Sequence, residues 1–181
     1  MKMDKITRAR KIFDDYHGSY FHMAREGVLD EYKSYKIPRK MEILWLTEQK
    51  NMHKQQLLEC ENNKMIAEQF SLLGEYVAEL HDKKTLNFMV EYVTCHSANW
   101  DSNTTLRNIN VIFSTYGFII SDRQKDIIRK KCVEILKESI SAGIWISDDY
   151  KENGLLPDYL FEEELQDKIQ RAIQYWSNNR R

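Results

Sequence analysis

The chain has 181 residues, of which 42% are hydrophobic and 30% are charged. A chain of this length can bury enough apolar surface to fold without a disulfide or a metal, so we expect residues 1–181 to form a single helical domain. Lys and Arg number 27 and Asp and Glu number 28, which gives a net charge of -1. Near-neutrality excludes the overall positive field that draws proteins to nucleic acids or anionic membranes.

The sequence also carries signals that bear on location. Its first residues contain no apolar stretch that could act as a signal peptide, and no later segment approaches the roughly 18 apolar residues of a membrane span. Three cysteines, Cys60, Cys95 and Cys132, are widely spaced and form no C-x-x-C pair. This usage is typical of reduced thiols, so we expect a cytoplasmic protein that does not associate with membranes.

The N-terminal third reads as a series of helices. Apolar residues at helical spacing from Ile6 to Tyr16 predict a first helix, with Gly18 as its left-handed cap. Ser19 can cap a short second helix that stops near Gly27, and the segment 28–35 fits a further helical turn. Pro38 suits the first position of a helix that runs to about Cys60.

The remaining segments continue the pattern in chain order. Apolar residues at helical spacing from Ile66 to Leu80, Leu86 to Val93, Leu106 to Tyr116 and Ile128 to Leu136 predict four more helices. Asp82 and Ser121 are the expected caps, 101–105 is expected to be a loop and cap, and Gly143 is the expected stop. Ser121 and Gln124 form a capping box. Gly74 lies inside a stripe, which suggests that a neighbouring element packs closely there.

The end of the sequence is less regular. The region 144–157 has no helical stripe and contains a turn signal at Asn153-Gly154, and a last helix should begin near Asp158. No strand-like alternation competes with the helical stripes. We therefore expect an all-α fold, a compact bundle of seven or eight mostly antiparallel helices, with a short irregular α-solenoid as the alternative.

The densest group of chemically able residues lies around the second helix. His22 and Glu26 are four residues apart, so both would lie on one helix face, with Arg25 beside them and His17 across the Gly18 turn. A carboxylate beside an imidazole orients it and raises its basicity, as a general base or metal ligand requires. The candidate pocket residues are His17, Tyr20, His22, Arg25 and Glu26; the competing interpretation is an ordinary surface pair.

Other chemical templates are missing from the sequence. Asp14 and His17 form one Asp-x-x-His step, but a di-iron bundle needs two such steps, and there is no zinc spacing and no Gly-rich phosphate loop. His53 and His81 stand alone, which indicates surface or half-buried positions. Cys95-His96 resembles an activated thiol, although a packed cysteine is the commoner case. We expect no metal and no cofactor.

Basic residues concentrate in the helix expected over 121–142. Arg123, Lys130 and Lys137 share its outer face with Asp126 and Glu134, and opposite charges one turn apart favour a solvated face with internal pairing. A nucleic-acid helix would show a cleaner basic stripe. Nucleic-acid binding through this helix is therefore the weakest alternative.

The functional prediction follows from these absences and from the aromatic content. Ten Tyr, seven Phe and four Trp include residue types that are favoured at interfaces. The sequence favours a non-catalytic helical protein-interaction or regulatory module that binds a protein partner or associates with itself. The first alternative is a small-ligand binder or metal-assisted enzyme that uses the segment His17–Glu26.

Overall fold

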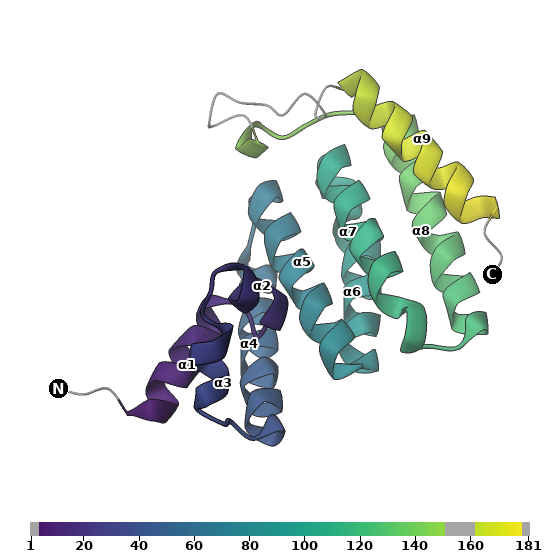
Figure 1. Ribbon diagram of the computed structural model, residues 1–181. Helices are drawn as coiled ribbons and strands as arrows, with labels where there is room; N and C mark the ends of the chain where they lie inside the picture. Colours follow the sequence, from purple (N-terminus) through teal and green to yellow (C-terminus); the bar gives the residue numbers. More distant parts are fainter. Residues whose placement is uncertain (1–3, 151–161, 179–181) are drawn as a thin grey trace. The chain divides into compact units, whose positions relative to one another are not determined.

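The computed structural model describes residues 4–150 and 162–178, and every regular element within these ranges is a helix (Figure 1). The prediction of an all-α fold is confirmed. The chain divides into two compact units, Met1–Gln55 and Gln56–Arg181. The prediction of a single domain over 1–181 stays a prediction, because this division does not say whether either unit folds alone.

Four helices begin in the N-terminal unit: α1 (Lys5–Asp15), α2 (Tyr20–Arg25), α3 (Leu29–Ser34) and α4 (Arg39–Glu59), whose last turn belongs to the second unit. The turn between α1 and α2 depends on Gly18, which has a φ of +72°. A Cβ at this glycine would lie 2.7 Å from Phe13 and 2.8 Å from Leu46, so no other residue fits. Ser19 then caps α2, as expected, because its Oγ accepts a hydrogen bond from the His22 backbone N–H at 3.3 Å.

The core of this unit is built around aromatic rings. Phe13 of α1 is fully buried and its ring packs against Tyr32 of α3 and Trp45 of α4, with centroids 5.9 and 5.3 Å apart. Most of the stripe predicted for α1 is indeed buried. Ile6 departs from it, at 49% exposed, because it lies in the first turn of α1, beyond the edge of the core.

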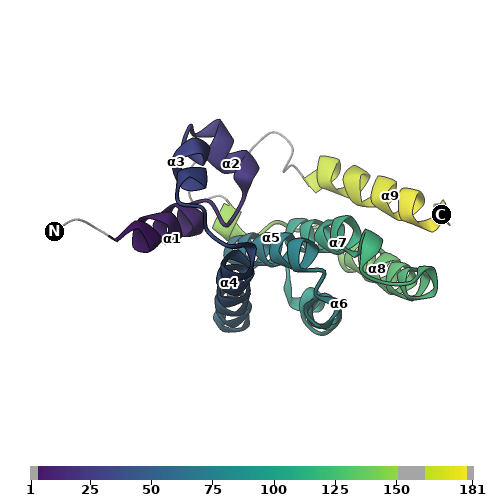
Figure 2. The same ribbon diagram turned by 60° about the horizontal axis from the view of Figure 1, so that its bottom comes forward.

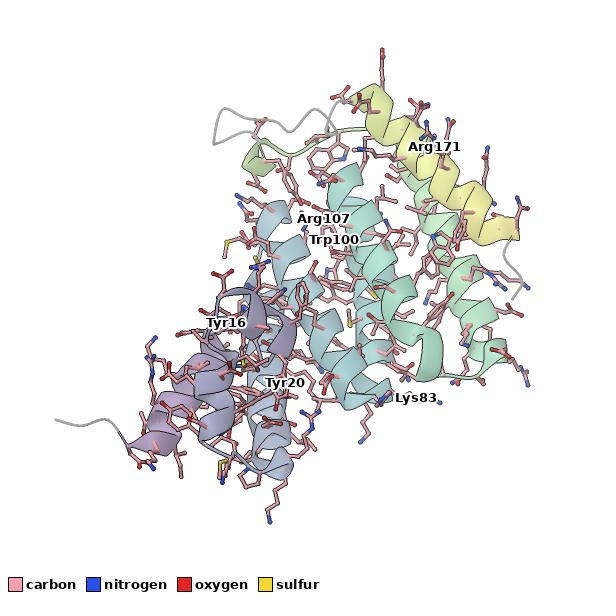
Figure 3. All side chains as sticks on the ribbon, viewed as in Figure 1. Tyr16, Tyr20, Lys83, Trp100, Arg107 and Arg171 are labelled. Atoms are coloured by element: carbon pink, nitrogen blue, oxygen red, sulfur yellow. The ribbon has the colours of Figure 1, made fainter. Side chains whose placement is uncertain are left out.

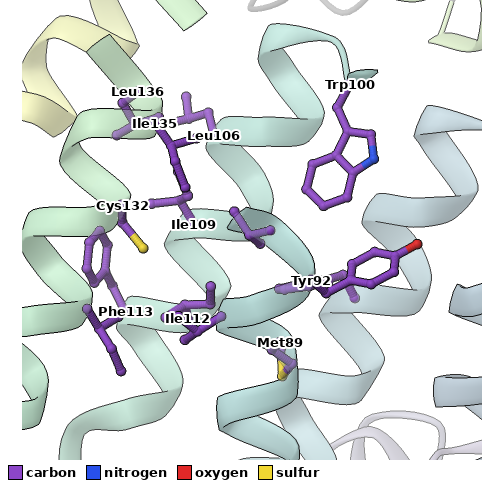
Figure 4. Packing of buried hydrophobic residues seen from close by; sticks show 14 of the residues in the cluster. Met89, Tyr92, Trp100, Leu106, Ile109, Ile112, Phe113, Cys132, Ile135 and Leu136 are labelled. Atoms are coloured by element: carbon purple, nitrogen blue, oxygen red, sulfur yellow. The ribbon is translucent and has the colours of Figure 1, made fainter. Parts of the chain in front are cut away.

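The C-terminal unit contains α5 (Asn63–Leu80), α6 (Lys83–His96), η1 (Ser97–Asn99), α7 (Ser102–Thr115), η2 (Tyr116–Phe118), α8 (Asp122–Ala142), η3 (Asp148–Tyr150) and α9 (Glu162–Asn178). Helices α5, α7 and α8 lie side by side, with α6 against one face of this layer and α9 against the other (Figure 2). The buried side chains of α6, α7 and α8 interlock in its centre (Figure 4).

Helices α5 and α7 approach each other closely at Gly74. A Cβ at this position would overlap with Cγ1 of Val111, so the glycine is required by packing and not by backbone conformation. The close neighbour predicted from the sequence is therefore α7.

Side-chain caps fix the helix ends in the C-terminal unit. Asp82 caps α6, Ser121 and Gln124 form the expected capping box of α8, and Gly143 follows the end of α8. The predicted turn at Asn153-Gly154 and the predicted helix start near Asp158 lie outside the described residues. The described part of α9 begins at Glu162, with three glutamates in its first turn.

A buried aspartate joins three segments of this unit. The carboxylate of Asp101, which is fully buried, accepts hydrogen bonds from the backbone N–H groups of Thr104 at 2.6 Å and Ser147 at 2.8 Å. The backbone N–H of Asp101 donates to Oδ1 of Asn63 at 3.0 Å. The side chain of Asp101 thus caps α7 and also binds the segment after α8. Its backbone N–H binds Asn63 at the start of α5.

Among the residues described, none of the helices combines the length and apolar character that a membrane crossing requires.

Candidate functional site

The N-terminal unit contains a cleft of about 350 Å³. Its wall is formed by Arg10, Asp14 and His17 from α1 and the turn after it, and by Glu48, Gln49, Met52 and His53 from α4. The cleft lies wholly within this unit, so its geometry depends only on how α1 and α4 pack. Its volume is near the lower end of the roughly 300–1,000 Å³ of small-molecule sites.

An arginine with two carboxylate partners forms one side of the cleft. Nε of Arg10 donates to Asp14 at 2.6 Å, Nη1 donates to Glu48 at 2.7 Å, and the guanidinium lies 5.1 Å from the ring centre of Trp45. Burial alone would lower the pKa of Arg10, but the bonds to Asp14 and Glu48 raise it on balance. Through these contacts the guanidinium of Arg10 joins α1 to α4.

Asp14 also determines how the amide of Gln49 is oriented. Its second carboxylate oxygen accepts a hydrogen bond from Nε2 of Gln49. Because an ionised carboxylate can only accept, the NH2 group of Gln49 must face Asp14 and the carbonyl oxygen must point away from it. Gln49 is only 4% exposed, and this oxygen has no hydrogen-bond partner.

Two imidazole rings meet in the wall of the same cleft. The rings of His17 and His53 have centroids 5.9 Å apart and planes at 64°. His17 reaches this position from a left-handed backbone conformation, with a φ of +52°, in the turn that ends α1. His53 is 6% exposed, so the prediction that it lies on the surface or is half-buried was wrong.

The side chains of the cleft carry charges of both signs. Arg10 supplies one positive charge against the carboxylates of Asp14 and Glu48, so the cleft disfavours anions. None of its side chains is a hydroxyl, thiol or amine that could act as a nucleophile. Among the described residues, no three His, Cys, Asp or Glu side chains are grouped so that they could hold a metal ion.

Only one of the predicted pocket residues lines this cleft. His17 does so, whereas Tyr20 lies on α2 (Figure 3). Its hydroxyl donates to the carboxylate of Glu42 at 2.5 Å. Glu42 is 3% exposed and also accepts from the hydroxyl of Tyr32 at 2.7 Å. Tyr20 therefore ties α2 to α4 through a buried carboxylate.

The predicted pairing of His22 with Glu26 is not formed. Glu26 is the C-cap residue of α2, and its backbone N–H donates to the His22 carbonyl at 3.1 Å, so the two residues do lie one turn apart. Glu26 instead accepts from Nε of Arg25 at 2.9 Å, and both side chains are exposed. The His22 ring packs near Phe21, with centroids 5.6 Å apart. Of the five predicted residues, the structure places only His17 in the wall of the cleft.

Sequence reasoning missed Gln49 and His53. Both lie on the inner face of α4, four residues apart and in register with the buried Trp45 and Leu46. A polar pair on the buried stripe of a helix was the available signal. Nothing in the spacing, however, indicates that the pair would face Asp14 and His17 of another helix.

The thiols do not form a second reactive centre. Burial raises the pKa of Cys132 to about 12, which keeps this thiol protonated and unreactive. Cys95 is exposed, and the His96 ring beside it in sequence packs on Tyr92, with centroids 4.4 Å apart. This stacking gives the imidazole of His96 a packing role.

Basic residues of α8 pair with carboxylates on the same helix. Lys125 contacts Asp122 at 3.0 Å, Lys137 contacts Glu134 at 2.7 Å, and Arg129 contacts Asp126. Of the outer-face residues, Lys137 pairs with Glu134 as the sequence suggests, whereas Asp126 pairs with Arg129. Nucleic-acid binding through residues 121–142 gains no support from this arrangement.

Large apolar side chains are exposed in the N-terminal unit. Phe21 of α2 is 72% exposed, and Ile43 and Leu44 of α4 are 43% and 55% exposed. Tyr20 and Glu42, which precede Phe21 and Ile43 in the chain, are joined by their hydrogen bond. Exposed apolar residues mark a protein-binding surface where they form a contiguous patch, whereas single ones are common on any protein.

Comparison of the chain with protein-family models, with curated proteins and with solved structures finds no match.

Proposed function

We propose that this protein is a non-catalytic, regulatory helical module that binds a small ligand in the cleft between α1 and α4. The observation that carries the proposal is the carbonyl oxygen of Gln49, a residue of the cleft wall, which is buried without a hydrogen-bond partner. Its amide is held by Asp14, which is held in turn by Arg10. A polar group fixed in this way is prepared for a donor that the protein itself does not supply.

The energetic argument concerns this oxygen. A buried acceptor without a partner costs about 1–3 kcal/mol in folding free energy. A ligand that brings an N–H or O–H group to Gln49 recovers this cost as binding free energy, and about 1.4 kcal/mol corresponds to a tenfold gain in affinity. The free protein thus carries a penalty that the bound state relieves.

The same residues define the class of ligand. It carries at least one hydrogen-bond donor, is neutral or weakly cationic, and is small enough for a cleft of about 350 Å³. A flat or ring-containing molecule suits the site, because His17 and His53 offer imidazole faces and edges. Phosphate esters and other polyanions are disfavoured by Asp14 and Glu48.

The test uses pairs of small lactams and amides, each N–H compound with its N-methylated counterpart. Nuclear magnetic resonance spectra of the 15N-labelled full chain report the side-chain NH2 signals of Gln49 during titration. We expect N–H members to shift these signals and N-methylated members to shift them less, because only the former can donate to Oε1.

A matched pair of variants provides the control. Gln49→Met removes the amide from the cleft, whereas Gln56→Met makes the same change at an exposed position of α4 outside the cleft. The proposal predicts loss of binding in the first variant and none in the second. Equal binding by both, or no shift of the Gln49 signals with any N–H compound, would overturn it.

Protein interaction is the second candidate function, and the exposed side chain of Phe21 favours it. Phe21 is 72% exposed, and Ile43 and Leu44 on α4 are exposed as well. Exposed apolar area of this kind is what a partner or a second copy would cover. Light scattering over a range of concentrations tests self-association. A mass that rises with concentration and falls back in Phe21→Ser supports it; a constant monomer mass contradicts self-association through this surface.

A further inference from the structure

The C-terminal unit contains a separate cavity of about 150 Å³. It lies where η1 leads into α7 and where α8 ends, and its wall includes Trp100, Thr105, Ile135, Glu138 and Trp145. Trp100 and Ile135 lie at the same end of the packed core, the end at which α7 begins (Figure 4). None of the residues of the α1–α4 cleft takes part in it.

The wall of this cavity includes two tryptophans and one carboxylate among mostly small residues. Trp100 is 6% exposed and provides a fixed indole, whereas Trp145, at 45% exposed, forms a more open side. The carboxylate of Glu138 is exposed and forms no ion pair with any described residue. No lysine or arginine contributes to the wall. Indole rings and a carboxylate without a competing cation attract positive charge.

The end of α8 adds to this preference. Ala142, its last residue, and Gly143, which follows it, both border the cavity. The last carbonyl groups of a helix lack intrahelical donors and carry the negative end of the helix dipole. In a helix of 21 residues this partial charge is fully developed, and it adds to the charge of Glu138.

A buried hydroxyl in the wall completes the polar groups of the cavity. Thr105 is 1% exposed and its Oγ1 has no hydrogen-bond partner. This hydroxyl can accept a bond from a polar hydrogen or donate one to a ligand oxygen. Like Gln49 in the other unit, Thr105 belongs to the wall of a cavity and has a buried polar atom without a hydrogen-bond partner.

From these features we propose that the cavity binds a small alkylated ammonium group. Two indoles, one carboxylate and a helix C-terminus are the elements that recognise such cations, because methylated ammonium is weakly hydrated and gains from aromatic faces. The volume is well below the roughly 300–1,000 Å³ of sites for whole drug-sized ligands. It fits a cationic head group, carried by a free metabolite or by a methylated lysine side chain.

The first experiment compares choline with 3,3-dimethylbutan-1-ol, which has the same shape and hydroxyl but no charge. The readout is the indole N–H signal of Trp145 in the full-length protein, identified by its loss in Trp145→Leu, with sodium chloride matching ionic strength. We expect saturable binding of choline and an affinity at least about tenfold lower for the neutral analogue. Equal affinities, or no saturable shift with choline, would overturn the proposal.

The second experiment places the cation next to Glu138. Glu138→Gln keeps the shape of an exposed side chain and should lower choline affinity about threefold, the size of an exposed charge contact. Glu134→Gln is the matched control, since Glu134 lies one turn earlier on α8, outside the cavity wall, and should leave affinity unchanged. Equal effects of the two substitutions would contradict the proposed position.

A third probe distinguishes the two sources of the ligand. A short peptide with trimethyllysine carries the same head group as choline on a protein chain. Tighter binding of the peptide indicates a methylated protein as the natural source, and tighter binding of choline indicates a free metabolite. If neither binds, the proposal fails.

Discussion

The imidazole rings of His17 and His53 lie with their centroids 5.9 Å apart, one in the turn after α1 and the other near the end of α4. Both rings belong to the wall of the cleft, together with Arg10 and its carboxylate partners Asp14 and Glu48. Gln49, in the same wall, keeps a carbonyl oxygen without a partner. Single substitutions can test both the stability of the fold around the cleft and the binding of a ligand in it.

Asp101 should matter far more to stability than another capping aspartate. In Asp101→Ala two buried backbone N–H groups, those of Thr104 and Ser147, lose their acceptor, so we expect a loss of about 3 kcal/mol in the free energy of unfolding. Asp82→Ala removes the cap of α6 at a position that water can reach and should cost about 1 kcal/mol. Urea unfolding followed by circular dichroism measures both; equal losses would contradict the joining role of Asp101.

Glu42 should stabilise the N-terminal unit through its tyrosine partners. Glu42→Ala leaves the buried hydroxyl of Tyr32 without an acceptor, so we expect a loss of about 2–3 kcal/mol. Arg39→Ala should cost less than about 1 kcal/mol, because the arginine is more than half exposed.

A double variant separates the hydrogen bond from packing at this site. Combining Glu42→Ala with Tyr32→Phe removes donor and acceptor together, and the double variant should be less destabilised than the sum of the two single changes. Additive losses in chemical unfolding would show that the carboxylate and the hydroxyl do not act as a pair.

Gly74→Ala should destabilise the C-terminal unit in spite of the higher helix propensity of alanine. The added methyl group overlaps with Val111, at a cost of about 1–3 kcal/mol, against a gain of up to about 1 kcal/mol from propensity. Val111→Ala should make the same substitution neutral or favourable. Gly117→Ala is the control, because nothing lies within 4 Å of its added Cβ. Thermal unfolding that shows no rescue by Val111→Ala would count against the close contact of α5 and α7.

The Cys132 thiol should make the fold sensitive to alkali. In the unfolded chain this thiol ionises with a pKa of about 8.5. Burial raises its pKa in the folded protein to about 12. The stabilisation is therefore complete below about pH 8.5 and is lost as the pH rises toward 12, with about 2 kcal/mol lost by pH 10.

Two cysteine variants isolate this effect. Cys132→Ala should flatten the decline in stability between pH 8.5 and pH 10, whereas Cys95→Ala, at an exposed position, should retain it. The comparison uses urea unfolding at both pH values. An identical slope in the two variants would contradict the account.

The features predicted correctly from the sequence are local ones. The capping box of Ser121 and Gln124, the caps at Ser19 and Asp82 and the left-handed Gly18 each depend on residues within one turn of the chain. Helical stripes likewise report which face of a helix is apolar, and the core follows them.

The candidate site could not be predicted fully, because it depends on contacts between helices that the spacing of residues along one helix does not reveal. His22 and Glu26 have the right separation for a pair and lie one helical turn apart, but the Glu26 carboxylate accepts from the neighbouring Arg25 instead. His17 was placed in a pocket correctly, yet its neighbours there are Gln49 and His53, which come from α4. Their meeting depends on how α1 packs against α4, which the spacing along either helix leaves undetermined.

The most direct test of the ligand-binding claim is a ratio of affinities. For an N–H lactam and its N-methylated counterpart, calorimetric or magnetic resonance titration gives two dissociation constants in the unmodified protein and two in Gln49→Met. We expect the N–H compound to bind about tenfold more tightly to the unmodified protein, and the two compounds to bind equally to the variant. A preference of the same size in Gln49→Met would show that the unpaired carbonyl oxygen has no part in binding.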